Sequence, residues 1–385
     1  MSLPHADLAA RWAAARTTPA VVHLDHAACS RQSATVLEAV VTHLRLEAEI
    51  GGYAVEEAAE PAIAAGRAGL AQLVGLGADD VAFTESAQGA LDRLLSCWPG
   101  LGPGSRVAVT RSEYGPSVAW LSDHGATVLD LPDHDDGTVD TDALPGWLDR
   151  ERPALAVLTH LASQRGLVQP VAAIARQCRA ADVPVIVDAA QSLGHVRCDD
   201  VDADAWVATS RKWLAGPRGI GVIAVAPRAA ARLELQAPSL GPRWHPGNAS
   251  VLRRLGSQES HIAGRVGIAV AVAEHLAVGP ETARERLAAL GSLAAQILPV
   301  EGWRPAPGQS GSAIVSLEPP AGVDPLAVCR MLRADHAVLT AYAGPERAPR
   351  DHRPPLVRFS PHLDTTEEDL IAAAAALVAT TRSLT

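Results

Sequence analysis

One lysine, Lys212, stands among the 33 lysine and arginine residues of this 385-residue chain. Arginine replaces lysine wherever only a positive surface charge is needed, but its guanidinium stays protonated at any physiological pH. The ε-amine of lysine loses its proton when it is buried or near other cations, and the neutral amine attacks carbonyl carbons to form a Schiff base. Lys212 is therefore either an accident of an arginine-rich composition or a nucleophile kept for its chemistry.

A carboxylate and a glycine-rich segment accompany this lysine. Asp188 directly follows the apolar run VPVIV, and Gln191 comes within the next turn. Taken alone, Asp188 is read as a helix N-cap, although a carboxylate at this place can also pair with a protonated ring nitrogen. Lys212 precedes GPRGIG, whose glycines allow sharp backbone turns. A Schiff-base lysine and an acid for a pyridinium nitrogen are the protein groups that pyridoxal phosphate requires.

The segment TESAQG (84–89) has the composition of an anion site. Thr84 ends a predicted strand, and Ser86, Ala87 and Gln88 lead into a predicted helix. Free N–H groups and the helix dipole favour a phosphate at such a helix start. An ordinary turn between a strand and a helix has the same pattern, so the phosphate interpretation depends on Lys212 and Asp188.

Strands and helices alternate around these residues. Short β-rich runs are predicted as strands at 79–84, 105–110, 153–160, 183–190, 204–210 and 219–226. Helical spacing is present at 88–98, from about 117 onward, and at 171–182. This alternation predicts a mostly parallel sheet covered by helices on both faces, with the ligand outside the carboxyl ends of the strands.

A second, smaller α+β unit is predicted in the last third of the chain. Its helices are expected at 262–277, 281–297, 325–335 and 365–384, and its strands at 312–319 and 355–362. We therefore expect a large domain at 17–252. The small domain takes 253–385, together with an N-terminal arm at 1–16.

The composition of the chain argues against several classes of binding partner and indicates the compartment in which the protein is expected. The formal net charge is −10, and the absence of a basic tract argues against nucleic-acid binding. Apolar runs stay well short of 18 residues, and the N-terminus is expected to be an amphipathic helix, so neither a membrane span nor a signal peptide is expected. The five cysteines are never spaced as C-x-x-C, so we expect no metal site, no disulfide scaffold and a reducing cytoplasm.

The combined motifs resemble the class V aminotransferase family of pyridoxal-phosphate enzymes. They are DAAQSLGH (188–195), TSRKWLAGPRGIG (209–221), VHLDHAACS (22–30) and LVRFSPHLDTTEEDL (356–370). The resemblance covers nearly the whole chain and implies an α/β fold of type I among these enzymes. It also implies a homodimer with shared active sites that acts on a small amino-acid substrate.

The family's roles transfer residue by residue. The resemblance implies that Lys212 binds the cofactor and moves protons, that Asp188 holds the pyridine nitrogen, and that Gln191 contacts the ring hydroxyl. For the phosphate it implies Ser86, Ala87, Gln88, Thr209 and Arg211. Ala87 stands at a position where threonine is usual, so backbone N–H groups are the expected contacts there, and the guanidinium of Arg211 suits a phosphate.

Further positions correspond to ring-stacking and substrate residues. Tyr114 occupies the place of a ring-stacking histidine, where a tyrosine stacks equally well; a half-buried core tyrosine is the alternative. Arg358 is expected to bind the substrate α-carboxylate. Ser163 stands where relatives have an asparagine near the substrate, and His26 and Ala28 belong to the N-terminal element on the substrate side.

The reaction is narrowed by a missing cysteine and by a closer resemblance. The stretch 339–349 matches the loop in which cysteine desulfurases carry their sulfur-accepting cysteine, and it contains none. Cys329 lies in a predicted helix and is expected to be packed. Segments 24–31, 159–167 and 257–276 resemble the carbon–sulfur lyases of ergothioneine biosynthesis, which implies β-elimination from hercynylcysteine sulfoxide to a sulfenic acid, pyruvate and ammonia.

One departure from the family concerns substrate recognition. Glu259 stands where desulfurases have a threonine that reaches the phosphate of the partner subunit. A carboxylate there is repelled by phosphate but suits the trimethylammonium group of a hercynyl substrate. We therefore expect Glu259 of one subunit near that group in the partner subunit's site; a solvated surface glutamate is the alternative. Other class V activities, desulfurase-like or isopenicillin N epimerase-like, and a non-catalytic cofactor-binding protein remain as alternatives.

Overall fold

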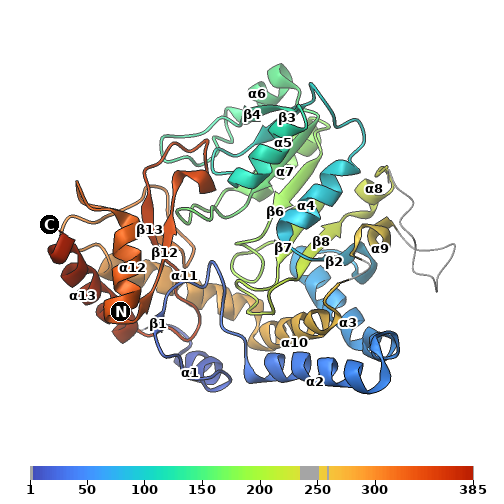
Figure 1. The fold of residues 1–385 in the computed structure, drawn as a ribbon. Helices are drawn as coiled ribbons and strands as arrows, with labels where there is room; N and C mark the ends of the chain where they lie inside the picture. Colours follow the sequence, from blue (N-terminus) through green and yellow to red (C-terminus); the bar gives the residue numbers. More distant parts are fainter. Residues whose placement is uncertain (1–2, 235–250, 258–259, 385) are drawn as a thin grey trace.

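Two sheets of unequal size organise the chain (Figure 1). The computed structural model describes residues 3–234, 251–257 and 260–384. A seven-stranded sheet occupies the larger part, and a four-stranded sheet with its helices lies beside it. The predicted α/β fold with a smaller α+β part is confirmed.

The large sheet has the strand order β2-β8-β7-β6-β5-β3-β4. Its strands are β2 (Val81–Thr84), β3 (Arg106–Val109), β4 (Thr127–Asp130), β5 (Leu155–Thr159), β6 (Val185–Asp188), β7 (Ala205–Thr209) and β8 (Gly221–Val225). Only β8 runs against the others, pairing antiparallel with both β2 and β7. The carboxyl ends of the other six strands therefore lie along one edge of the sheet.

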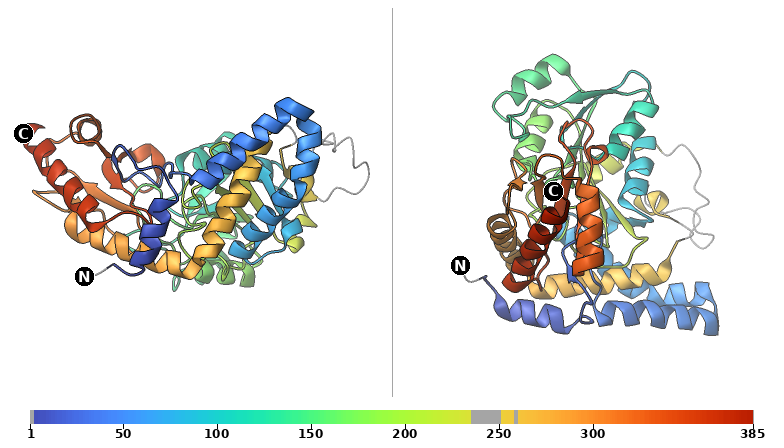
Figure 2. Two further views of the ribbon diagram at one scale, coloured as in Figure 1. Left: turned by 90° about the horizontal axis from the view of Figure 1, so that it is seen from below. Right: turned by 60° about the vertical axis from the view of Figure 1, so that its left-hand side comes forward.

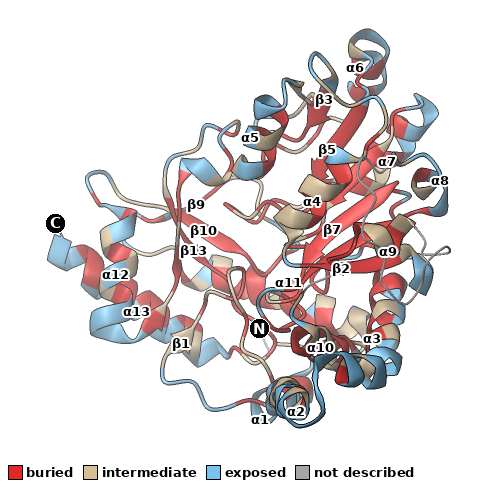
Figure 3. Cartoon of the chain, turned by 45° about the vertical axis from the view of Figure 1, so that its right-hand side comes forward, coloured by how far each residue is buried: buried red, intermediate tan, exposed pale blue. Residues whose placement is uncertain are grey.

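The strands of the large sheet are mostly buried (Figure 3). Along each central strand the side chains alternate between two hydrophobic cores, one on each face of the sheet. In β5, Ala156 and Leu158 join the core on one face, while Leu155 and Val157 join the core on the other. This burial on both sides explains why the strands appear in the sequence as continuous apolar runs. The helices of the first face are α3 (Gly52–Val74), α6 (Leu144–Glu151), α7 (Val171–Ala180) and α10 (Ile262–Val278). Those of the second face are α4 (Ala87–Ser96), α5 (Gly115–Asp123), α8 (Pro227–Ala230) and α9 (Val251–Leu255).

The small sheet has the strand order β12-β13-β10-β9 and is antiparallel throughout. Its strands are β9 (Arg304–Pro305), β10 (Val315–Glu318), β12 (Ala341–Ala343) and β13 (Leu356–Phe359). The helices α11 (Pro280–Ile297), α12 (Pro325–His336) and α13 (Glu367–Leu384) share its hydrophobic core. Short 3-10 turns, η1 (Ala78–Asp80) and η2 (Pro345–Arg347), precede β2 and follow β12.

The N-terminal segment crosses between the two sheets. It contains α1 (Ala6–Ala14), β1 (Val22–His23) and α2 (Ala34–Ile50), and β1 pairs with β11 (Val338–Leu339). Helices α2, α3 and α10 pack against one another along the lower side of the molecule, and both chain ends lie on the side of the small sheet (Figure 2). The predicted division of the chain at residue 252 stays a prediction. Helix α10, which that division places in the small domain, packs on the core of the large sheet.

The predicted elements of residues 79–226 and 262–384 are confirmed, with ends that differ by a few residues. The sequence analysis did not predict helices α2, α3, α6, α8 and α9, strand β4 or the short strands β1, β9, β11 and β12. Within the described ranges, no single helix is long and apolar enough to span a membrane; α10 and α11 pass that test only as a pair bent by 83°.

Candidate active site

The carboxyl edge of the large sheet gathers the residues that the sequence singled out. Asp188 is the last residue of β6, and Lys212 follows β7, which is the neighbouring strand. Tyr114 follows β3, Ser163 follows β5, and Ser86 follows β2. The order of strands, rather than proximity in sequence, brings these segments together at one edge.

Lys212 is a lysine with an unusually acidic ammonium group. Burial lowers the pKa of its amine from 10.5 to about 7, against the opposing charge of Asp188. The positive charges of Arg211, Arg358 and Arg347 act in the same direction as burial. At neutral pH a large share of the amine therefore carries no proton and can attack a carbonyl carbon. This environment favours the chemical interpretation of the lone lysine over chance.

The backbone beside Lys212 is held by a buried network. Trp213, which is 1% exposed, donates its indole N–H to Oε1 of Gln191 at 2.9 Å. Gln191 in turn donates from Nε2 to the carbonyl of Ala27 at 2.9 Å, which ties the N-terminal segment to β6 and β7. The second N–H of that amide is left for another acceptor, which is compatible with the predicted contact to a ring hydroxyl.

Asp188 lies beside a second acid that sequence reasoning missed. Glu113 is fully buried and accepts hydrogen bonds from the hydroxyl of Thr159 at 2.8 Å and from the N–H of Tyr114 at 3.1 Å. Burial and the charge of Asp188 raise the pKa of Glu113 to about 8. Burial also raises the pKa of Asp188, which the Ala190 N–H and the Lys212 ammonium oppose. The charge of Lys212 favours the ionised form of Asp188, and the charge of Asp188 favours the protonated form of Glu113.

The start of α4 provides unpaired donors for an anion. Ser86 caps the helix by accepting the N–H of Gly89 at 2.9 Å, and Ala90 donates to the Ser86 carbonyl. In the described part of the chain, the N–H groups of Ala87 and Gln88 have no acceptor. The Gln88 side chain donates to Asp92 of its own helix at 2.7 Å. The backbone, rather than this side chain, therefore offers contacts to a phosphate.

Two further predicted phosphate residues lie at the end of β7. Thr209 donates its hydroxyl to the Ile220 carbonyl at 3.2 Å, and that hydroxyl oxygen remains free to accept. The guanidinium of Arg211 forms no ion pair within the described residues, and burial lowers its pKa. Tyr114 follows β3 at the same edge of the sheet, and its predicted stacking on the cofactor ring stays a prediction.

Arg358 reaches the site from β13 of the small sheet. Its side chain is fully buried; Nη2 donates to Oδ1 of Asp25 at 3.0 Å and Nη1 donates to the Ser163 carbonyl at 2.7 Å. The Nε group is buried and has no hydrogen-bond partner among the described residues. Asp25, the acid of the LDHAA motif, was not assigned a role from sequence, although it balances this buried cation.

His26 and Ala28 occupy the segment next to Asp25. The His26 ring is 3% exposed and packs against the rings of His23 and His362, with centroids 4.3 and 5.0 Å away. Ala28 is partly exposed. Their predicted contacts with substrate stay predictions. Glu259 lies outside the described residues, so its predicted role also stays a prediction.

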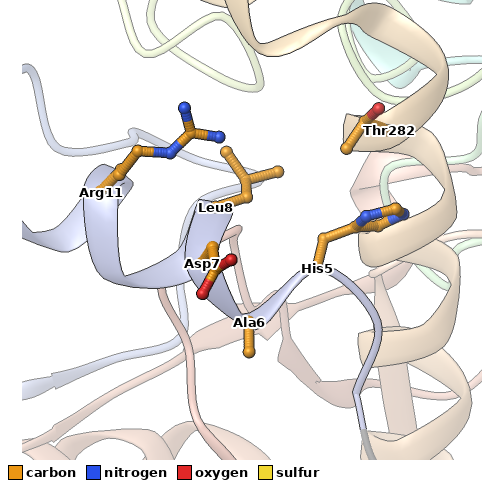
Figure 4. Close-up of a pocket in the computed structure, with 6 residues that line it drawn as sticks. All are labelled: His5, Ala6, Asp7, Leu8, Arg11 and Thr282. Atoms are coloured by element: carbon orange, nitrogen blue, oxygen red, sulfur yellow. The ribbon is translucent and has the colours of Figure 1, made fainter.

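One surface hollow lies apart from this site. It lies between α1 and the start of α11 and is lined by His5, Ala6, Asp7, Leu8, Arg11 and Thr282 (Figure 4). None of the predicted site residues borders it. The candidate active site is therefore defined by its chemistry and its place on the sheet.

The residues present fit pyridoxal phosphate. Lys212 supplies a partly deprotonated amine, Asp188 a carboxylate, and the start of α4 unpaired N–H donors. Residues 22–370 match the sequence profile of the family described as Aminotransferase class-V, and the chain belongs to this family of pyridoxal-phosphate enzymes.

Individual relatives agree with this assignment. The chain is 47% identical, over 97% of its own length and 94% of the relative's, to a probable hercynylcysteine sulfoxide lyase of Mycobacterium tuberculosis. Among solved structures, the fold resembles the cysteine desulfurase CsdA of Escherichia coli, with a TM-score of 0.85, 21% identity and coverage of 98% and 99% of the two chains. It also resembles the cystine C-S lyase C-DES, with a TM-score of 0.82, 20% identity and coverage of 93% and 97%.

Proposed function

We propose that this enzyme cleaves the C–S bond of hercynylcysteine sulfoxide by β-elimination. The main support for this substrate is the 47% identity, over 97% of this chain, to a probable hercynylcysteine sulfoxide lyase. The chemistry of the site supports elimination, because it combines a Schiff-base lysine, an acid for the ring nitrogen and a buried arginine for a carboxylate.

This chain's own residues have distinct tasks in that reaction. Arg358 binds the α-carboxylate and so fixes the orientation of the amino acid. Asp188 keeps the ring nitrogen protonated, and Lys212 accepts the proton of the α-carbon, for which its lowered pKa of about 7 is suited. When bound, pyridoxal phosphate supplies an electron sink next to the α-carbon.

The overall reaction needs only water as a second reactant. The Cα–H and Cβ–S bonds break, the sulfur leaves with its electron pair as a sulfenate, and hydrolysis of the remaining three-carbon fragment yields pyruvate and ammonia. Conversion of the sulfenic acid to ergothioneine requires a separate reductant.

The cysteines support elimination over desulfuration. Residues 339–349 contain no cysteine. Cys329 lies in α12 against the small-sheet core, and burial raises the pKa of its thiol to about 11. A thiol that stays protonated at neutral pH is a poor sulfur acceptor.

The test compares substrates in a pyruvate assay with the cofactor-loaded enzyme. We expect pyruvate from hercynylcysteine sulfoxide, little from the matching thioether or from free cysteine, and no protein persulfide. A sulfenate is a weaker base than an aliphatic thiolate, so it leaves more readily from the same site. Persulfide on Cys329 with rapid turnover of free cysteine would indicate a desulfurase instead. Racemisation without pyruvate would indicate an epimerase, and the absence of any turnover would indicate a non-catalytic protein.

We also propose that the enzyme is a homodimer with an isologous interface. Apolar side chains on α2 and at the start of α3 are exposed in the single chain: Leu37 is 56%, Leu44 44%, Ile50 61% and Tyr53 73% exposed. A second copy that covers such a face by twofold symmetry removes this apolar surface from water. Sedimentation equilibrium is expected to give twice the chain mass, and a fully active monomer would contradict the proposal.

A further inference from the structure

Arg347 lies at the end of η2, in the connection between β12 and β13 that leads to Arg358. This turn is fixed on two sides. Its first carbonyl, that of Gly344, accepts hydrogen bonds from the Arg347 N–H at 3.1 Å and from Nε2 of the buried Gln164 at 3.2 Å. The turn also contacts the start of α5 so closely that a Cβ on Gly115 would come 2.0 Å from the Glu346 carbonyl oxygen. Arg347 therefore directly follows a residue that packs against Gly115, the residue after Tyr114.

The guanidinium of Arg347 has no protein partner within the described ranges. Its Nε atom is shielded from solvent and makes no hydrogen bond, and the side chain forms no ion pair with any described carboxylate. Neighbouring arginines of the same connection have partners: Arg350 forms an ion pair with Asp130, and Arg353 donates from Nη2 to the Asp135 carbonyl at 3.0 Å. A partly buried arginine that leaves its donors unused is poised for an acceptor that the protein does not supply.

The charge of Arg347 acts directly on the reactive centre. Burial is the main cause that lowers the pKa of both Lys212 and Arg358, and Arg347 contributes to the lowering at each of them. Gln164, which binds the turn of Arg347, directly follows Ser163, whose carbonyl accepts a hydrogen bond from Arg358. Arg347 is therefore a third basic side chain at this site, where Lys212 serves the α-carbon and Arg358 the α-carboxylate. Arg347 is not needed to bind the amino-acid part of the substrate, because Lys212 and Arg358 already serve it.

We propose that Arg347 is a specificity-determining residue that binds the oxygen on the substrate's sulfur; this inference rests on the proposed function and deepens it. In a cysteine conjugate, the sulfur is two bonds from the α-carbon, so it lies beside the group that serves that carbon. A sulfoxide oxygen carries partial negative charge, and a guanidinium is a forked donor suited to it. A thioether offers no such acceptor and gains nothing from Arg347.

The interaction strengthens during the reaction. As the Cβ–S bond breaks, its electron pair leaves with sulfur, and the sulfinyl group becomes a sulfenate whose oxygen bears the negative charge. The proton of the α-carbon passes to Lys212, and the electrons of that C–H bond form the Cα=Cβ bond. A fixed cation at the oxygen therefore binds the transition state more tightly than the ground state, which raises the rate of C–S cleavage.

The experiment separates recognition of the oxygen from general damage to the site. The cofactor-loaded wild type, Arg347→Gln and Arg347→Lys are compared in two measurements: kcat/KM for pyruvate release from hercynylcysteine sulfoxide, and the dissociation constant of the matching thioether by the change in cofactor absorbance. We expect Arg347→Gln to lower kcat/KM for the sulfoxide by about 10- to 100-fold while thioether binding changes by less than about threefold. Arg347→Lys should lie between the two, because it keeps the charge but not the fork.

Arg350→Gln is the matched control, since it removes an arginine of the same connection that is already paired with Asp130. We expect it to leave both measurements near the wild-type values. An equal loss of sulfoxide turnover and thioether binding in Arg347→Gln, or no change in either, would overturn the role of Arg347 and leave the lyase proposal standing. A wild type that releases no pyruvate from the sulfoxide would overturn both proposals.

Discussion

We expect that replacing Lys212 with alanine abolishes turnover and leaves the fold intact. A methyl group forms no Schiff base and accepts no proton, so we expect kcat to fall by about 1,000-fold or more. Lys212→Arg should be almost equally inactive although it keeps the positive charge, because a guanidinium is never deprotonated in proteins. The pyruvate assay measures the loss, and circular dichroism with thermal unfolding checks the fold. Substantial activity in the arginine variant would show that this lone lysine has no chemical role.

The pH dependence of cofactor attachment gives a second check on Lys212. Only the neutral amine attacks the cofactor's aldehyde, and burial lowers the pKa of that amine to about 7. Attachment of pyridoxal phosphate to the cofactor-free protein should therefore accelerate as the pH rises through about 7 and then level off. A rise that continues toward pH 10.5, the ordinary pKa of a lysine, would contradict the perturbed environment.

Replacing Arg358 with glutamine has the second largest expected effect, on binding and on stability together. Arg358 is fully buried and pairs with Asp25, so its loss leaves a carboxylate without its partner and without the cation for the substrate. Removal of one partner of a buried pair lowers the free energy of unfolding by about 3–5 kcal/mol. We expect amino-acid ligands of all kinds to bind about 100-fold more weakly, because each loses the same charge-assisted contact.

A pair of ligands isolates the carboxylate contact from the loss of stability. Titrations compare an amino acid with the matching amine that lacks the α-carboxylate. The wild type should prefer the amino acid, and Arg358→Gln should bind both about equally. Asp25→Asn is the matched control: it also breaks the buried pair, but it keeps Arg358 and should retain the preference. Loss of the preference in Asp25→Asn alone would contradict this assignment.

The order of elements and the identity of the central groups could be predicted from the sequence. The strands of the large sheet are buried on both faces, so each one appears as an uninterrupted apolar run, and polar residues at its end mark the carboxyl edge. Lys212, Asp188 and the helix start at Ser86 were found in this way. Each depends on its local sequence, because a strand end or a helix cap involves only a few neighbouring residues.

Helices α2 and α3 could not be predicted in the same way. Exposed Leu37, Leu44, Ile50 and Tyr53 place apolar residues away from the buried stripe, so the helical periodicity is blurred. Pro61 lies inside α3 and reads as a helix end when the sequence is considered alone. A second copy that covers this face would explain the apolar residues.

The sequence by itself determined which chemical groups the site contains and which strand or helix end carries each of them. Only the tertiary structure decided their partners, since Glu113 meets Asp188, and Asp25 meets Arg358, across separations that no local pattern spans. The protonation of Lys212 was decided in the same way, because its pKa of about 7 results from burial and from charges brought in by the small sheet and by η2. Long-range packing sets the solvation and electrostatics of a group, whereas local sequence sets its chemical identity.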